Sequence, residues 1–179
     1  MKIIKKILIA IAALVALFLI AALILPDAYH VKREVTIQTP KDTLFNYLKN
    51  LKNQDDFSVW NKMDPNMKKS FKGTDGTVGA VSSWKSDSAN VGSGEQEIIN
   101  IADGQRIDFE LRFFEPWQST DYAYFTTEAV DSAHTKVTWG FNGKMPYPWN
   151  VMLLTMDMDE MLGKDLEQGL QNLKSEMER

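Results

Sequence analysis

Two carboxylates lie two positions apart near the middle of the chain, a spacing that would let both side chains act on one ligand. Glu95 and Glu97 lie in the run GSGEQEIINIA, which predicts a strand. On a strand they would share one face about 7 Å apart, and two carboxyl groups at roughly this distance can flank a glycosidic bond. We favour the plainer interpretation, a solvated strand face. Gln96 and Ile98 take the opposite face, where Gln96 would be a polar contact if that face lines a cavity.

A second acidic candidate lies in the C-terminal segment, which has the spacing of an amphipathic helix. Thr155 and Asp159 fall near its apolar stripe. An acid at that place could orient a ligand hydroxyl, or act as a base whose pKa is raised by burial. The alternative, which we favour, is a position at the edge of the helix that reaches water.

Several chemistries are excluded by composition. The chain has no cysteine, which removes thiolate nucleophiles, iron–sulfur clusters and cysteine zinc sites. The two histidines, His30 and His134, have no serine or acid partner that the sequence reveals. We therefore expect no metal, no cofactor and no catalytic residue that can be named.

Large apolar side chains form the other candidates. Trp60, Trp84 and Trp139 can serve the core or line a pocket. Met152 and Met156 belong to a methionine cluster around the start of the last helix. Flexible thioethers suit an adaptable apolar pocket, and ordinary core filling explains them nearly as well.

The elements that must position these residues follow from periodicity. The run HVKREVTIQTP alternates as a strand does, and Thr39 as N-cap with Pro40 at the first position predicts a helix start. About six further strands follow, two of them joined by a turn at 103–104. In one of these, Phe109 and Leu111 share a face. A long helix over 151–177 ends the chain, so a curved antiparallel sheet can wrap a single helix and leave space on its concave side.

The composition of the N-terminal segment predicts a membrane helix. Residues 7–25 contain no polar side chain, and 19 helical residues reach about 28 Å, close to the thickness of a bilayer core. Three lysines precede the segment, which predicts a cytoplasmic N-terminus and a domain on the extracytoplasmic side. A cleaved signal peptide is the competing interpretation, but its apolar core would be shorter and LILPDAYH is a poor cleavage site. We divide the chain into an anchor, 1–27, and one domain, 28–179.

The charge of the domain limits its partners. The net charge of the chain is −4, and setting aside the three N-terminal lysines leaves −7 for residues 27–179. An acidic domain repels phosphate backbones and anionic lipid, so neither nucleic-acid binding nor strong electrostatic attachment to a membrane is expected.

The order of elements carries a family resemblance. The chain resembles the START-related helix-grip superfamily, called SRPBCC, and within it the polyketide cyclase/dehydrase and lipid-transport group. The matching pieces cover Val31 to the C-terminus and include VKREVTIQTPKDTLFNYLKNLKNQDDFSVW, GTDGTVGAVSSW, VGSGEQEI, RIDFELRF, TKVTW and LGKDLEQGLQNLKSEME. The resemblance implies an α+β fold in which a seven-stranded antiparallel sheet grips the C-terminal helix around a hydrophobic cavity. It does not settle a reaction, because such folds serve both catalysts and carriers.

We therefore expect a membrane-anchored domain that binds or carries a hydrophobic small molecule or lipid between sheet and helix. The alternatives are a cyclase/dehydrase- or hydrolase-type enzyme acting in the same cavity, and a non-catalytic module that binds another envelope protein. The cavity candidates are Trp60, Trp84, Gln96, Ile98, Phe109, Leu111, Trp139, Met152, Thr155, Met156 and Asp159.

Overall fold

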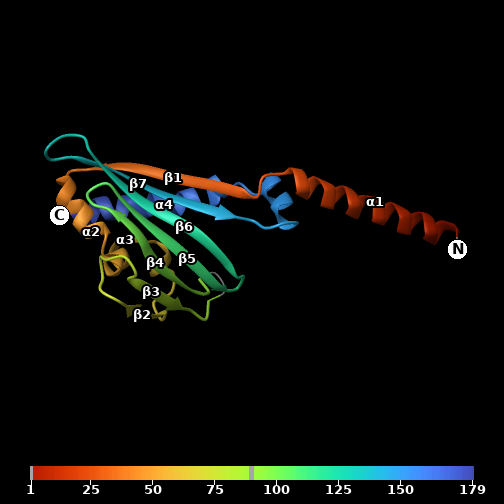
Figure 1. The fold of residues 1–179 in the computed structure, drawn as a ribbon, viewed down its shortest axis with the longest axis horizontal. Coiled ribbons are helices and arrows are strands. Elements are labelled where there is room, and N and C mark those ends of the chain that lie inside the picture. Colours follow the sequence, from red (N-terminus) through yellow and green to blue (C-terminus); the bar gives the residue numbers. More distant parts are fainter. Residues whose placement is uncertain (1, 89–90) are drawn as a thin grey trace.

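The computed structural model describes residues 2–88 and 91–179. Its first element, α1 (Lys2–Ile24), projects away from the rest of the chain (Figure 1). The side chains of α1 are exposed along almost its whole length, and by length and composition the helix can span a membrane. Only three residues, 25–27, separate α1 from the first strand.

Seven antiparallel strands form one curved sheet in the order β1-β7-β6-β5-β4-β3-β2. The turn at Asp103–Gly104 joins β4 to β5 as predicted, with Gly104 at a positive φ of 67°. The strands are β1 (Ala28–Ile37), β2 (Lys68–Lys72), β3 (Val81–Lys85), β4 (Ser93–Ala102), β5 (Arg106–Glu115), β6 (Ser119–Ala129) and β7 (Thr135–Lys144).

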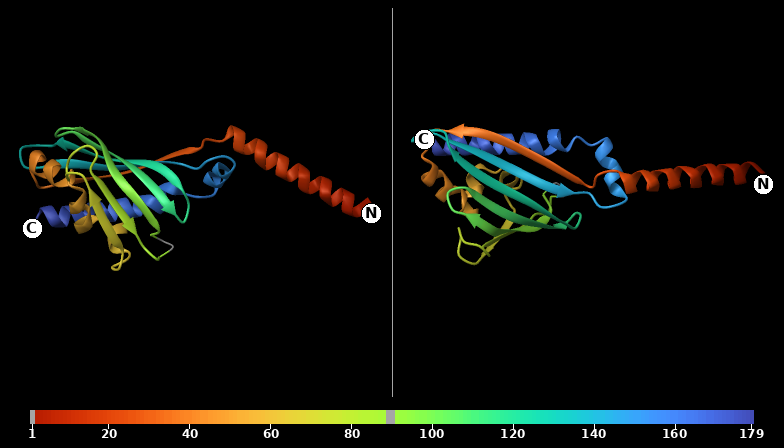
Figure 2. Two further views of the ribbon diagram at one scale, coloured as in Figure 1. Left: turned by 60° about the horizontal axis from the view of Figure 1, so that its bottom comes forward. Right: turned by 45° about the horizontal axis from the view of Figure 1, so that its top comes forward.

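Helical elements cover one side of this sheet, which we call the inner face (Figure 2). The long helix α4 (Met158–Met177) runs beside β1. Short helices fill the connection from β1 to β2: α2 (Lys41–Leu48), η1 (Leu51–Asn53), α3 (Gln54–Phe57) and η2 (Trp60–Lys62). The core lies between these helices and the inner face. Alternation along the strands supplies the sheet side of the core, and the three-and-four spacing in α4 supplies Leu166, Leu170 and Leu173.

The start of the first domain helix differs from the prediction. Pro40, not Thr39, occupies the N-cap of α2, and no side chain caps the helix. The Thr39 hydroxyl donates instead to the carbonyl of Met177, and the Thr39 carbonyl accepts from the buried hydroxyl of Thr135. Thr39 therefore ties the end of β1 to the last turn of α4.

The C-terminal helix is also shorter than its apolar spacing suggested. A 3-10 segment, η3 (Trp149–Leu154), precedes it, and α4 begins only at Met158. Asp157 ends the interruption because its carboxylate accepts the backbone N–H of Glu160, a side-chain cap that starts a new helix. Val151 and Leu154 thus belong to a separate segment that packs near the end of α1.

Candidate functional site

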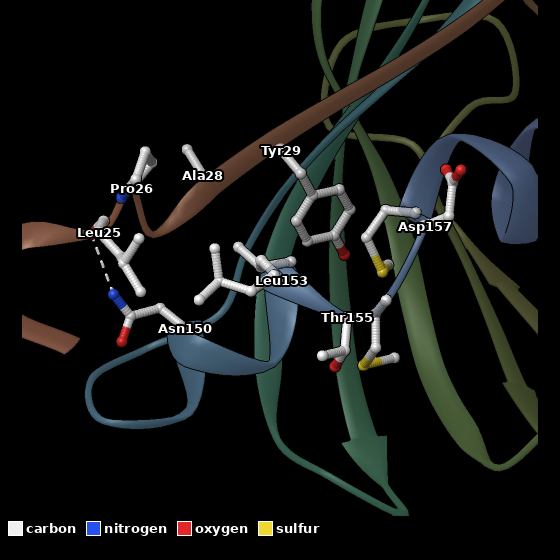
Figure 3. Close-up of a pocket in the computed structure, with 11 residues that line it drawn as sticks. Leu25, Pro26, Ala28, Tyr29, Asn150, Leu153, Thr155 and Asp157 are labelled. Carbon is white, nitrogen blue, oxygen red and sulfur yellow. Dashed lines mark hydrogen bonds between the residues drawn. The ribbon is translucent and has the colours of Figure 1, made fainter. Parts of the chain in front are cut away.

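A pocket of about 580 Å³ lies where α1, β1 and η3 meet. We call this part of the molecule the α1 end, and the part around Ile37 and Thr135 the far end. Figure 3 shows the pocket with its walls drawn from two separated stretches of chain, 25–29 and 150–158. The lining is mainly apolar and consists of Leu25, Pro26, Ala28, Tyr29, Asn150, Leu153, Leu154, Thr155, Met156, Asp157 and Met158.

Tyr29 forms the β1 wall of this pocket and is held firmly in place. Its ring stacks on Phe141 with centroids 6.1 Å apart. The ring lies over Gly143 of β7, where an added Cβ would come within 2.2 Å of the ring. Figure 3 shows the side chain reaching from β1 toward Thr155. Burial and the nearby carboxyl of Asp121 raise the pKa of Tyr29 to about 12, so the phenol stays protonated and can donate a hydrogen bond.

Asp121 is a buried carboxyl near Tyr29 on the same face of the sheet. It is 5% exposed and belongs to β6, where it shares the inner face with Ala123 and Phe125. Its carboxyl oxygens accept from the backbone N–H of Lys144 at 3.1 Å and the hydroxyl of Ser119 at 3.0 Å. Burial raises the pKa of Asp121, and these hydrogen bonds oppose part of the rise.

Asn150 joins the pocket to α1. It is 2% exposed, and its amide nitrogen donates to the carbonyls of Ala22 at 2.8 Å and Leu25 at 3.0 Å (Figure 3 draws the bond to Leu25). The last carbonyls of a helix lack partners within the helix. Asn150 satisfies two of them from a position 125 or more residues away in the chain, and Ala22 is buried by the contact.

Two of the candidates chosen from sequence, Thr155 and Met156, line the pocket. Met152 lies on the neighbouring turn of η3 and is 44% exposed. These three come together because η3 and the segment after it fold back over the start of β1.

The remaining apolar candidates lie deeper or further along the inner face. Ile98 and Phe109 are fully buried, and Trp139 packs edge-on against Trp60 with centroids 5.7 Å apart. These four contact core side chains. Trp84, Gln96 and Leu111 lie half-buried on the inner face at the α1 end, with Gln96 opposite Leu111 in the register.

The acidic candidates are neutralised by arginines. Asp159 is exposed and forms a bidentate pair with Arg33 at 2.8 and 2.9 Å. Arg33 lowers the pKa of Asp159, so the edge position is the observed one and a base with a raised pKa is not. Glu95 and Glu97 lie on the outer face, where each accepts from Arg112 at 2.7 Å.

No group of three carboxylates or imidazoles that could hold a metal ion occurs within residues 2–88 and 91–179. The chemistry at the α1 end is therefore that of an apolar pocket with a phenol on its wall and a buried carboxyl nearby. Such a site can bury apolar surface and hold one polar group of a guest.

Sequence reasoning missed Tyr29, Asp121 and Asn150. The first two carried a signal, because each keeps the alternation of buried residues in its strand: Tyr29 with Val31, and Asp121 with Ala123. Asn150 carried none, because its partners lie in a helix that the sequence alone does not place beside it.

Comparisons with known proteins agree with this fold. The model of a family described as polyketide cyclase/dehydrase and lipid transport matches residues 28–178. No curated protein matches the sequence.

Solved structures match over most of the chain. The Aha1 dimer from Colwellia psychrerythraea has 12% identity and a TM-score of 0.58, covering 84% of this chain and 96% of that one. Protein Mll3558 from Rhizobium loti has 17% identity and a TM-score of 0.60 (83% and 96%). Protein CV1439 from Chromobacterium violaceum has 11% identity and a TM-score of 0.58 (84% and 97%). At these identities the likeness concerns the fold alone.

Proposed function

Since this chain belongs to the polyketide cyclase/dehydrase and lipid transport family, we propose that it is a membrane-anchored domain that binds or carries a hydrophobic small molecule or lipid. The observation that carries the proposal is the open pocket of about 580 Å³ at the α1 end, whose lining is more apolar than polar. Pockets for small molecules span roughly 300–1,000 Å³ and are lined mainly by apolar side chains with a few polar groups. The ligand is held without covalent chemistry, by burial of apolar surface at about 25 cal/mol per Å².

The pocket differs in place from the cavity expected between sheet and helix. Leu166, Leu170 and Leu173 of α4 fill the far part of the inner face and are at most 1% exposed. The space for a guest lies beyond them, where η3 replaces α4. Thr155 and Met156 are thus our strongest ligand contacts among the residues chosen from sequence, with Tyr29 added as the polar group.

The proposal includes an uncleaved anchor. A signal sequence and an anchor both fit the composition of α1. Two features favour the anchor: Asn150 bonds to the carbonyls of Ala22 and Leu25, and Leu25 and Pro26 form part of the pocket wall. Cleavage after Pro26 would remove Ala22, Leu25 and Pro26 and with them these contacts. The three lysines before the apolar run favour a cytoplasmic N-terminus and a domain on the extracytoplasmic side, which the proposal includes.

Photo-crosslinking tests the binding site directly. The full chain is reconstituted in lipid nanodiscs that contain a phospholipid with a diazirine on its acyl chain, and adducts are mapped by mass spectrometry. We expect adducts on α1 and also on the segment 153–158. Ala28→Trp, which fills the pocket, should lose the adducts on 153–158 and keep those on α1. Val78→Trp, an exposed site outside the pocket, serves as the control. Adducts confined to α1 in the unmodified chain would overturn the proposal.

One observation favours the enzyme as second candidate, namely the buried carboxyl of Asp121 near the phenol of Tyr29. A carboxyl whose pKa is raised by burial is a candidate general acid or base. Asp121 is, however, not among the residues that line the pocket, and both its oxygens already accept hydrogen bonds. Turnover of a polyketone or ester by the full chain that is lost in Asp121→Asn would support the enzyme. Unchanged ligand binding in this variant supports the carrier.

A further inference from the structure

The exposed large apolar side chains of the domain are unevenly placed. Outside α1, several are scattered singly over the sheet and its turns, as on any soluble surface. Others gather at the α1 end, in two segments far apart in sequence. The first is η3 with its preceding turn, which exposes Tyr147 (50%), Trp149 (59%), Met152 (44%) and Leu154 (66%).

The second segment, which we call the β5–β6 turn, is the last part of β5 with the residues that join it to β6; Phe114 is 47% exposed there and Trp117 is 82% exposed. Because β5 ends and β6 begins at the α1 end of the sheet, this turn points the same way as η3. Figures 1 and 2 show both segments at the end of the domain from which α1 leaves.

We propose that η3 and the β5–β6 turn form a second membrane contact, a surface that rests on the bilayer interface beside α1. The occupant is lipid at the level of the headgroups. Tryptophan and tyrosine are enriched at this level because their rings combine an apolar body with a polar tip. The inference rests on α1 spanning the bilayer, which brings the surface to the membrane: η3 contacts α1 and is bonded to its last turn through Asn150.

This membrane contact would hold the pocket next to the bilayer surface. Leu154 belongs both to the exposed surface and to the pocket lining, and Leu25 and Pro26 of the lining directly follow α1. A ligand that leaves the bilayer at this place enters the pocket without crossing bulk water. The acidic domain repels anionic lipid, but the contact depends on apolar and aromatic side chains and needs no attraction to such lipid.

Site-directed spin labelling can test the contact, since the chain has no native cysteine. Tyr147→Cys and Phe114→Cys are labelled separately in the full chain in zwitterionic phosphatidylcholine nanodiscs, so Trp149 and Trp117 stay intact. Two reference labels are Leu14→Cys in the middle of α1 and Val130→Cys, which is 60% exposed in the turn after β6 at the far end. Collisions of each label with oxygen and with a water-soluble nickel chelate report its depth. Circular dichroism checks that each variant is folded.

We expect the labels at 147 and 114 to collide several-fold less with the nickel chelate than the label at 130. If these two labels resemble the label at 130 while the label at 14 is in lipid, the second contact is refuted and the anchor stands. If the label at 14 is itself exposed to water, the anchor in the proposed function fails, and with it the basis of this inference.

Discussion

Two regions of the inner face use the same sheet in different ways. In the middle of the sheet, Phe57, Phe125 and Trp139 pack ring against ring, with centroids 4.9–6.0 Å apart, and Leu170 of α4 is buried in the same core. At the α1 end, the helix gives way to η3, and a pocket with Tyr29 on its wall takes the place of the core. In this chain the packed core and the pocket therefore occupy different lengths of the same inner face.

Glycines show the same contrast along α4. Gly169 faces Trp139, and an added Cβ would lie 2.6 Å from the indole. Gly163, nearer the α1 end, faces the guanidinium of Arg33. One glycine makes room for a rigid ring in a packed core, the other for the flexible tip of a side chain that reaches water.

The largest effect on stability is expected from shortening a buried core side chain of α4. Leu170→Ala removes a side chain that is 1% exposed and leaves a cavity, which should lower the free energy of unfolding by about 2–5 kcal/mol. Thermal unfolding of the full chain in mild detergent measures the loss. Leu153→Ala, in the pocket wall, is the matched control and should change stability by much less while weakening the photo-crosslinking of lipid. Equal losses of unfolding free energy in the two variants would show that the pocket wall is packed as tightly as the core.

The next largest effect on stability is expected from alanine substitutions at Gly169 and Gly163. Gly169→Ala forces the buried ring of Trp139 to shift, which should cost about 1–3 kcal/mol of stability. Gly163→Ala displaces only the end of Arg33, and the higher helix propensity of alanine, worth about 1 kcal/mol, offsets the strain. Side-by-side unfolding curves compare the two. A Gly163 variant less stable than the Gly169 variant would show that the surroundings of Arg33 are packed as tightly as those of Trp139.

The junction with α1 is expected to depend on Asn150. Asn150→Ala removes two hydrogen bonds to the end of α1 and should weaken its docking by about 1–2 kcal/mol. Pulsed electron–electron distance measurement between labels at 14 and 130, in nanodiscs, should then give a broader distribution. Asn142→Ala removes an exposed hydrogen bond within the sheet and should leave the distribution narrow. A distribution unchanged by Asn150→Ala would mean that other contacts hold the junction.

The smallest effect concerns pH. Burial raises the pKa of Asp121 above its unfolded value, so the folded chain binds the proton more tightly. The penalty of the buried charge is present above the folded pKa and falls as the pH drops through it toward the ordinary value of 3.8. Asp121→Asn cannot ionise and keeps an acceptor for Lys144. The advantage of this variant in Tm should therefore be largest at about pH 7 and shrink toward about pH 4. A difference in Tm between this variant and the unmodified chain that does not change with pH would contradict a raised pKa for Asp121.

Much of the fold was predictable because it rests on local patterns. Alternation placed Phe109 and Leu111 on one face, and the Asp103–Gly104 pair identified a hairpin that the structure contains. The same reasoning placed Asp159 at a helix edge and Glu95 with Glu97 on a solvated strand face. In the structure Arg33 pairs with Asp159, and Arg112 pairs with both glutamates.

The place of the pocket was not predictable in this way. The apolar spacing runs on from Val151 into α4, and it hides the break at 155–157 that lets η3 turn toward α1. The pocket depends on this break and on contacts such as Asn150 with Leu25, which join residues 125 apart in sequence. Such contacts leave no period in the sequence, so only the arrangement in space reveals them.

The shortness of the link between α1 and β1 has a consequence for transport. Three residues can extend by only about 10 Å, and Asn150 holds even this stretch close to the helix end. A carrier fastened to the bilayer in this way, as we propose for this chain, could not shuttle between two membranes. Under that proposal the ligand is taken up and released at the surface of the membrane that holds α1, so any acceptor would have to reach that surface.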